Sequence, residues 1–326
     1  MNEDELLQFL NDSTWDAPFF KRLAHNDTGE AAGNQAGVVI PIELRRFFPA
    51  LDHSLTSAQA PTVDRFLSAE MFTPTQQVGT AVVRYQFQTW GGTRRAESRL
   101  TDNLGPVRNL ARRGDMLIMQ RSRDRLDWYR LLLVRATDAA FGRFDAVTQG
   151  RRWGIFFPDR APVSQVDLTA ARQEMLAAVS QPFVPVRENI PRVATSRTAI
   201  ARETTFRETL IAEYNRSCAV SGIALATLTL AEAQAAHVIS LERGGADEPR
   251  NGFTLTGSLH WAFDRGLFGI GDDRRVFVPD RVRAMPENIW LVQYHDHFIA
   301  EAVTPELRTN PAAFQWHREN VVSAWN

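Results

Sequence analysis

Four short segments in the C-terminal half carry its most informative pattern: Cys218-Ala-Val-Ser-Gly222, Gln234-Ala-Ala-His237-Val-Ile239, Asn251-Gly252 and Leu259-His260-Trp-Ala-Phe-Asp264-Arg-Gly266. His237 ends an apolar, strand-like segment, and Phe253–Leu255 is short enough to be the second strand of a hairpin. Ser258 can cap a helix that runs to about Leu267. The pattern therefore predicts the order strand, loop, strand, helix.

The polar residues of this stretch have the spacing of a hydrolytic metal site. His260 and Asp264 are four residues apart, so on a helix they project from one face and can hold one divalent ion. His237, on the facing strand, is then placed to deprotonate a water for attack on phosphorus, while Asn251 braces the hairpin loop and orients the histidine ring. Each residue alone has an ordinary structural interpretation, but their order and spacing together favour metal-assisted hydrolysis of a phosphodiester.

From Cys218 to Phe277 the sequence resembles the HNH nuclease family, in the subgroup with C-x-V-S-G, A-A-H, N-G and L-H-x-x-F-D-x-G motifs. The resemblance implies that His237 is the general base, Asn251 the central asparagine, and His260 and Asp264 the metal-side pair, with Mg²⁺ or Mn²⁺ as the expected cofactor and other divalent ions left open. Many members place an Asp or His ligand directly before the base, where this chain has Ala236. We therefore expect either two protein ligands completed by water, or recruitment of another group, for which Gln234 is a candidate.

The residues up to about Leu168 are predicted to be rich in β-strands. Segments of strand length carry Val, Ile, Tyr, Phe and Trp at Thr80–Trp90, Met116–Gln120 and Trp128–Val134, and the last two are joined by a polar, hairpin-type connection. A short helix is expected after Pro41, with Leu44, Phe47 and Phe48 on one face.

Two polar loops interrupt this part. The first carries the candidate DNA contacts Lys21, His25, Asn26, Asp27, Thr28, Asn34 and Gln35, and the second carries Arg94, Arg95, Glu97 and Arg99. A carboxylate among arginines repels the phosphate backbone, but it can accept a hydrogen bond from a cytosine amino group while the arginines read guanine. A solvated loop with internal Arg–Glu pairs is the alternative, and the residues alone do not decide between the two.

Lys21–Pro41 and Arg95–Thr101 resemble the N-terminal DNA-recognition domain of EcoRII-type restriction enzymes. That family is a β-pseudobarrel that grips duplex DNA in the major groove between two loop arms. The resemblance implies that residues 21–35 form one arm and residues 94–99 the other. Asn34 replaces the family's histidine in the first arm, and Ser98 replaces its lysine after the glutamate, so the recognised sequence stays open.

Composition narrows the class of protein. The chain has 326 residues, 44% hydrophobic and 23% charged, which suits two soluble domains, and with no membrane-length apolar run and no signal-peptide pattern a cytoplasmic protein is expected. Cys218 is the only cysteine, so any metal must be held by His, Asp or Asn. The net charge is −1, yet the 37 basic residues include one lysine, Lys21, and arginine is the residue that reads guanine and phosphate in a bidentate way. Arginine-favouring codon usage explains that bias equally well.

These observations predict an α+β protein: a DNA-recognition pseudobarrel at 1–168, a helical and proline-rich linker at 169–198, and an HNH nuclease domain with flanking helices at 199–326. Helices are expected at Thr169–Val179 and from Thr205, where Thr205 and Glu208 have capping-box spacing. The predicted function is sequence-specific, metal-dependent, restriction-type cleavage of double-stranded DNA. The expected partners are DNA, a second protomer (through Pro305–Trp325) and a companion methyltransferase. A nuclease that senses methylcytosine and a non-cutting DNA-binding regulator are the alternatives.

Overall fold

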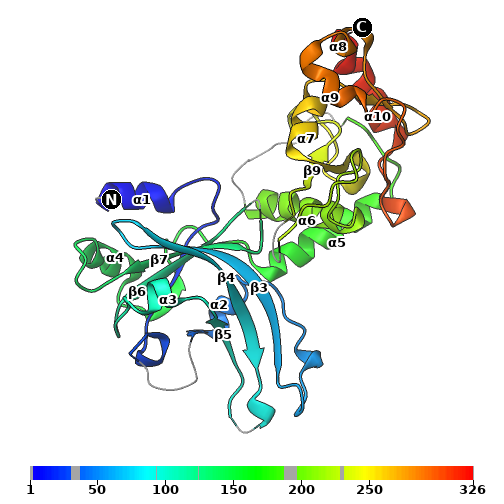
Figure 1. The fold of residues 1–326 in the computed structure, drawn as a ribbon. Coiled ribbons are helices and arrows are strands. Elements are labelled where there is room, and N and C mark those ends of the chain that lie inside the picture. The colour runs from blue at the N-terminus through cyan, green and yellow to red at the C-terminus, as the bar shows by residue number, and fades with distance from the viewer. Residues whose placement is uncertain are drawn as a thin grey trace. The chain divides into compact units, whose positions relative to one another are not determined.

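The computed structural model describes residues 3–30, 37–92, 94–123, 125–186, 197–227 and 231–325. The chain divides into two compact units, Met1–Asp167 and Leu168–Asn326 (Figure 1). The first is built on a sheet and the second is mainly helical around a small hairpin, so the predicted α+β class is confirmed. Within the described ranges, no helix combines the length and apolar character needed to cross a membrane.

One eight-stranded sheet forms the first unit, in the order β2-β5-β4-β3-β7-β6-β1-β8. All neighbouring strands are antiparallel except β3 and β7, which are parallel. The longest strands, β3 and β4, form one extended hairpin (Figure 1). The strands are β1 (Phe19–Arg22), β2 (Val38–Ile40), β3 (Thr62–Phe72), β4 (Gln77–Gln88), β5 (Glu97–Thr101), β6 (Met116–Arg121), β7 (Trp128–Val134) and β8 (Trp153–Ile155). The three strands predicted from sequence are therefore confirmed as β4, β6 and β7.

Side chains of β6 and β7 alternate between two cores. One core receives Leu117, Met119, Leu131 and Leu133, and the other receives Met116, Ile118, Leu132 and Val134. Because both faces are buried, these strands read as continuous apolar runs. The first core takes side chains from all eight strands, so the sheet curls around it into a half-barrel.

Short helices close the two cores. The predicted helix after Pro41 is present as α2 (Ile42–Arg45), but it ends before Phe47 and Phe48, which were expected on its face. Both phenylalanines are buried, and Phe48 stacks between Tyr85 and Tyr129, at centroid distances of 4.7 and 5.0 Å. The second core, which receives Met116 and Ile118, is covered by α1 (Glu3–Leu10) and α4 (Phe141–Thr148). The helix α3 (Gly105–Arg108) follows β5.

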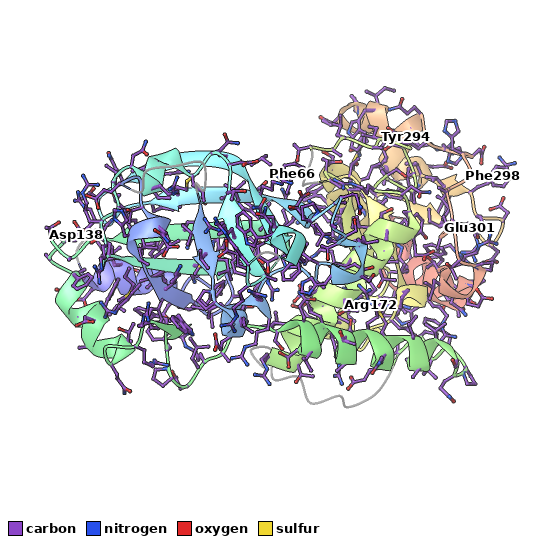
Figure 2. All side chains as sticks on the ribbon, turned by 90° about the horizontal axis from the view of Figure 1, so that it is seen from below. Phe66, Asp138, Arg172, Tyr294, Phe298 and Glu301 are labelled. Carbon is purple, nitrogen blue, oxygen red and sulfur yellow. The ribbon has the colours of Figure 1, made fainter. Side chains whose placement is uncertain are left out.

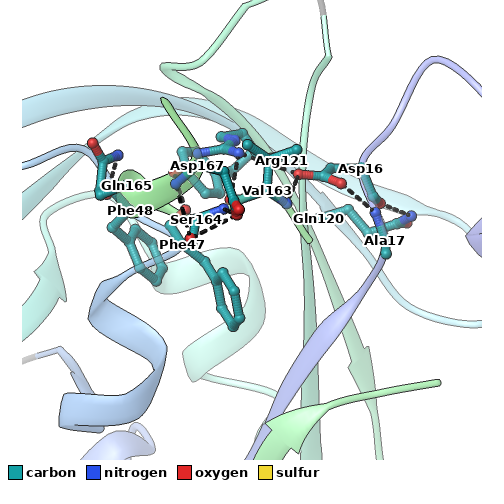
Figure 3. Close-up of polar contacts among 11 residues, drawn as sticks. Asp16, Ala17, Phe47, Phe48, Gln120, Arg121, Val163, Ser164, Gln165 and Asp167 are labelled. Atoms are coloured by element: carbon teal, nitrogen blue, oxygen red, sulfur yellow. Dashed lines mark hydrogen bonds and ion pairs between the residues drawn. The ribbon is translucent and has the colours of Figure 1, made fainter. Parts of the chain in front are cut away.

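A buried ion pair ties down the last segment of this unit (Figure 3). Arg121 Nη2 lies 3.2 Å from Asp16 Oδ2 and donates to the Val163 carbonyl at 2.8 Å. The Val163 amide in turn donates to Asp16 Oδ2 at 2.9 Å, and Gln165 Nε2 donates to the Phe48 carbonyl at 2.8 Å. This segment is thereby fixed to β6 and to the core of the sheet.

Two helices begin the second unit, and the unit boundary falls within the first of them, α5 (Gln165–Val179). It packs along α6 (Arg197–Glu213), where Arg172 pairs with Glu208 at 3.3 Å (Arg172 is labelled in Figure 2). The first third of the predicted linker is therefore a packed helix, while residues 187–196 lie outside the described ranges.

The predicted start of α6 at Thr205 is wrong. The helix is already present at Arg197, and Thr205 is a buried interior residue whose hydroxyl donates to the Ala201 carbonyl at 2.7 Å. Residues 197–204 favour helix well enough to extend it, and a threonine inside a helix can satisfy its hydroxyl on the preceding turn.

The predicted strand, loop, strand, helix order is confirmed in β9 (Gln234–His237), β10 (Gly252–Leu255) and α7 (Gly257–Asp264). The hairpin pairs antiparallel, with His237 opposite Gly252. After α7 come the hairpin of β11 (Gly269–Ile270) and β12 (Val276–Phe277), and then α8 (Asp280–Arg283), α9 (Ile289–Val292) and α10 (Pro311–Asn320). One apolar core joins α6, the β9–β10 hairpin, α7 and α10, and so fixes the elements that carry His237, His260 and Asp264.

Candidate active site and DNA-contacting loops

The plane of the His237 ring is fixed by α6. The imidazole stacks on Phe206 with ring centroids 3.8 Å apart and planes 3° from parallel. A Cβ at Gly252 would come within 2.5 Å of the Phe206 ring and 2.6 Å of Leu210, so only glycine lets α6 approach the hairpin this closely. The Asn-Gly dipeptide of the motif therefore has a packing reason as well as a turn-forming one.

Asp247, which the sequence analysis missed, faces the His237 ring. Its Oδ1 lies 3.5 Å from His237 Nε2, and both atoms are buried with no hydrogen-bond partner in the described part of the chain. A carboxylate at this place stabilises the positive charge that a histidine base acquires when it takes a proton. The spacing of Asp247 in the sequence does not predict its contact with His237, because that contact depends on the path of the loop between β9 and β10.

Asn251 closes that loop. It is fully buried; its Oδ1 accepts from the Ile239 amide at 3.0 Å, and its Nδ2 donates to the carbonyls of Ile239 and Ala246 at 2.9 and 2.8 Å. A Cβ at Gly245 would collide with the Ile239 carbonyl oxygen, so the loop can fold this tightly only with glycine there. These contacts suit the bracing role that the sequence suggested for Asn251, since they hold the backbone on both sides of the turn.

His260 and Asp264 lie one turn apart on α7, with Nε2 and Oδ2 separated by 3.7 Å. Gln234 of β9 is the second partner of this histidine, because His260 Nδ1 lies 3.0 Å from Gln234 Oε1. Since an amide oxygen can only accept, this contact suits a proton on Nδ1, which would leave the lone pair of Nε2 for a metal ion. Gln234, the candidate further ligand, thus contacts the ring of His260 in this structure.

Burial sets the protonation tendencies of this pair. Burial lowers the pKa of His260, with the Asp264 carboxylate opposing the shift and His237 adding to it. Burial also raises the pKa of Asp264, against the lowering effects of His260, Arg265 and His237. A neutral imidazole is the form that can donate its lone pair to a metal ion. Both pKa shifts include a contribution from His237, so the three side chains lie close enough to act electrostatically on one another.

The donor set fits a divalent ion held by few protein ligands. One imidazole nitrogen and one carboxylate oxygen are both common ligands of divalent ions. Across the described ranges no cluster of three or more His, Cys, Asp or Glu side chains is arranged to hold an ion. Ala236 is fully buried in the apolar core, so the position where many HNH proteins carry another ligand is filled by packing here. The remaining coordination positions would fall to water and phosphate oxygens.

In the first predicted DNA-contacting loop, Lys21, Asp27 and Thr28 are buried, with 6%, 1% and 0% of their surfaces exposed. Lys21 Nζ lies 2.6 Å from Asp27 Oδ2 and donates to the Val39 carbonyl at 2.5 Å. Asp27 Oδ1 accepts from the Val39 amide at 2.8 Å, and Arg108 donates to the Thr28 carbonyl at 2.7 Å. Their burial argues against the predicted direct DNA contact by these three residues and favours a role in anchoring the loop, because a buried lysine needs a carboxylate partner.

Of the other predicted DNA contacts in this loop, two are exposed and two lie outside the described residues. His25 and Asn26, in the short 3-10 helix His25–Asp27, are exposed. Asn34 and Gln35 lie outside the residues that the structure describes. His25 and Asn26 are therefore the first-loop candidates that the structure presents to solvent.

The second loop presents two of its three arginines. Arg94 and Arg95 are exposed, and the Arg94 guanidinium lies 5.4 Å from the centre of the Trp90 ring. Arg99 is 5% exposed and pairs with the half-buried Glu97, Nε to Oε1 at 2.7 Å, so the Arg–Glu pair considered as an alternative is present. Because Arg99 lies opposite Val39 in the sheet, the bases of both predicted arms meet at β2.

Comparison with known proteins gives a family match within the second unit. Residues 218–271 match the family model of the HNH endonucleases. No curated protein matches the chain. Among solved structures, the modification-dependent TagI restriction endonuclease is similar at 22% identity over 36% of this chain and 37% of its own, with a TM-score of 0.29. The B3 domain of the UbaLAI restriction endonuclease, solved with cognate DNA, is similar at 19% identity over 41% of this chain and 79% of its own, also with a TM-score of 0.29.

The chain thus spans 37% of the length of the TagI enzyme. The HNH family match includes the polar residues of the site described above: Gln234, His237, Asp247, Asn251, His260 and Asp264. The predicted HNH resemblance is confirmed for residues 218–271, which match the family model of the HNH endonucleases.

Proposed function

We propose that the chain is a restriction-type DNA endonuclease, in which the first unit recognises a duplex sequence and the HNH domain hydrolyses the backbone. The observation that carries this proposal is the arrangement around His237. Its ring is stacked on Phe206 at 3.8 Å, it faces the Asp247 carboxylate at 3.5 Å, and it is near enough to His260 and Asp264 to contribute to the pKa shifts of both. This is an oriented base beside a pair of metal-ligand type.

In the proposed reaction His237 takes a proton from water, whose oxygen attacks phosphorus while the bond to the leaving 3′ oxygen breaks. Asp247 stabilises the resulting imidazolium, and the stack on Phe206 keeps the ring in the plane that faces the water. Gln234 keeps the proton of His260 on Nδ1, so that Nε2 is free to bind a metal. A divalent ion held by His260 and Asp264 would neutralise charge on the phosphate and on the leaving oxygen.

The exposed residues of the two loops are the proposed DNA contacts: His25, Asn26, Arg94 and Arg95. We assign Glu97 to base reading, as an acceptor that Arg99 holds in position. A glutamate that only repelled phosphate would not suit a DNA-facing loop, whereas one that accepts from a cytosine amino group discriminates between bases. The exposed arginines supply the part of the affinity that depends on salt.

One HNH site hydrolyses one strand. Cleavage of both strands therefore requires two protomers on the DNA or two successive binding events, and we propose the former. A restriction nuclease of this kind also needs a companion methyltransferase to protect the host's own DNA.

The test is cleavage of unmodified and cytosine-methylated plasmid, each with Mg²⁺, with Mn²⁺ and with EDTA. We expect discrete, metal-dependent fragments from unmodified DNA, and the fragment ends will give the site. Fragments from methylated DNA alone would replace sequence-specific restriction by modification-dependent cleavage. Binding without cleavage of either plasmid, in every metal, would refute the nuclease proposal and support a regulator.

A further inference from the structure

Trp261 and Arg265 present an aromatic and a cationic side chain on the helix that carries His260 and Asp264. We propose that this pair is a second binding site for the DNA backbone, which holds the sugar and phosphate next to the scissile phosphate. The inference rests on the proposed nuclease function and adds residues to its substrate-binding surface.

The two side chains form one unit on the surface of α7. Trp261 is 55% exposed, Arg265 is exposed, and the Arg265 guanidinium lies 4.3 Å from the centre of the Trp261 ring. Arg265 Nη1 also donates to the Trp261 carbonyl at 3.2 Å. Residues one turn apart share a helix face, so Trp261 and Arg265 form a stripe directly beside the stripe of His260 and Asp264.

The C-terminal end of α7 is fixed by contacts with the last residues of the described chain. Trp325 Nε1 donates to the Arg265 carbonyl at 2.8 Å. At Gly266 φ is +69°, and a Cβ would lie 2.7 Å from the Val321 carbonyl oxygen, so the C-terminal segment packs directly against the helix end. Ala262 and Phe263, on the opposite side of α7, are fully buried. The exposed pair is therefore presented on a fixed support.

The chemistry of the pair points to a nucleotide. An exposed indole gains from packing against a sugar or a base, and a guanidinium stacked on an aromatic ring is well placed to bind a phosphate. Arg265 is also close enough to the metal-side pair that its charge lowers the pKa of Asp264 against the effect of burial. A phosphate that contacts Arg265 would thus be a neighbour of the phosphate at His260 and Asp264.

If Arg265 served only as a countercharge for Asp264, its replacement would change cleavage without changing the salt dependence of DNA binding. The test uses the full-length chain and measures two quantities against salt concentration. These are equilibrium binding of a duplex in the His237→Ala background, and single-turnover cleavage by the otherwise unchanged protein. Arg265→Gln removes the positive charge and Arg265→Lys keeps it. Trp261→Leu removes the aromatic ring and Trp261→Phe keeps a smaller one.

Arg281 on α8 and Phe298 provide matched controls, since both are exposed residues of the same unit away from α7. We expect Arg265→Gln to reduce the slope of log affinity against log salt by about 0.9, the value for one phosphate contact, and Arg265→Lys to retain it. Trp261→Leu should weaken binding roughly tenfold with the slope unchanged, and Trp261→Phe should weaken it less. Arg281→Gln and Phe298→Leu should leave both quantities at the parental value.

An unchanged slope in Arg265→Gln, with a lower cleavage rate at saturating DNA, would overturn the proposal and leave Arg265 as the countercharge of Asp264. An equal loss of affinity in Trp261→Leu and Phe298→Leu would also overturn it. Failure of the nuclease proposal would look different, because the parental protein would then not cleave at all. The slope measured by binding would still show whether Arg265 contacts a phosphate.

Discussion

Replacing Asn251 with alanine tests how the active-site loop is held. The change removes three hydrogen bonds and leaves the Ile239 amide and the carbonyls of Ile239 and Ala246 buried without their partner. Each buried polar group left unpaired costs about 1–3 kcal/mol, and three groups at the low end give about 3 kcal/mol. We therefore expect the loop between β9 and β10 to open roughly 100-fold more often, because each 1.4 kcal/mol is about a factor of ten.

Hydrogen exchange read by mass spectrometry on peptides that cover residues 238–246 measures this opening directly. Asn251→Asp is the control, because it keeps the acceptor for the Ile239 amide and turns the donor into an oxygen that faces two carbonyls. Its loop should open at least as often at neutral pH and less often once the new carboxyl is protonated. Unchanged exchange in Asn251→Ala, together with lost cleavage, would refute the bracing role and place Asn251 in the chemistry itself.

Three other predictions follow from buried and half-buried groups. His317 is stacked on Phe263, and burial lowers its pKa from 6.5 to about 4. The free energy of unfolding should therefore be highest above pH 6.5 and fall by up to about 3 kcal/mol as the pH drops towards 4, because the buried ring must then take up a proton. Urea unfolding from pH 4 to 7 should show this dependence on pH, and His317→Gln should flatten it. Lys21→Met leaves the Asp27 carboxylate buried without its cation, so calorimetry should show the first unit destabilised by about 3–5 kcal/mol, and adding Asp27→Asn should restore part of the lost stability. Lower DNA affinity at unchanged stability would instead make Lys21 a DNA contact. Glu97→Ala should relax base preference in a binding selection, whereas a uniform change in affinity across all sequences would speak against base reading.

Much of the fold was predictable because its signals are local. The two-sided burial of β6 and β7 appears in the sequence as unbroken apolar runs, and the helix after Pro41 follows from the placement of Leu44, Phe47 and Phe48. The order of the HNH elements could be predicted for a related reason. A glycine or asparagine at a fixed position and a four-residue spacing on a helix are both visible in the sequence itself.

The rest depends on contacts between distant segments. Asp247 faces His237 only because the loop folds back, and Phe206 reaches the same ring from α6, 31 residues earlier in the sequence. Lys21 was expected to contact DNA because its loop resembles a DNA-recognition arm, but its ammonium group is buried against the Asp27 carboxylate, a contact that local sequence does not reveal. The start of α6 was misplaced since the capping-box spacing at Thr205 is a short signal that continued helix on its N-terminal side overrides.

The role of His237 as the base is tested by comparing the parental protein with His237→Ala in metal-dependent cleavage and in DNA binding, on the same duplex. We expect the variant to lose at least 1,000-fold in single-turnover cleavage, in the range of about 10²–10⁴ for loss of a positioned base, while its DNA affinity and thermal unfolding stay at the parental values. Retained cleavage would contradict the assignment of His237 as the base. Lost binding or stability alongside lost cleavage would show that the histidine is structural.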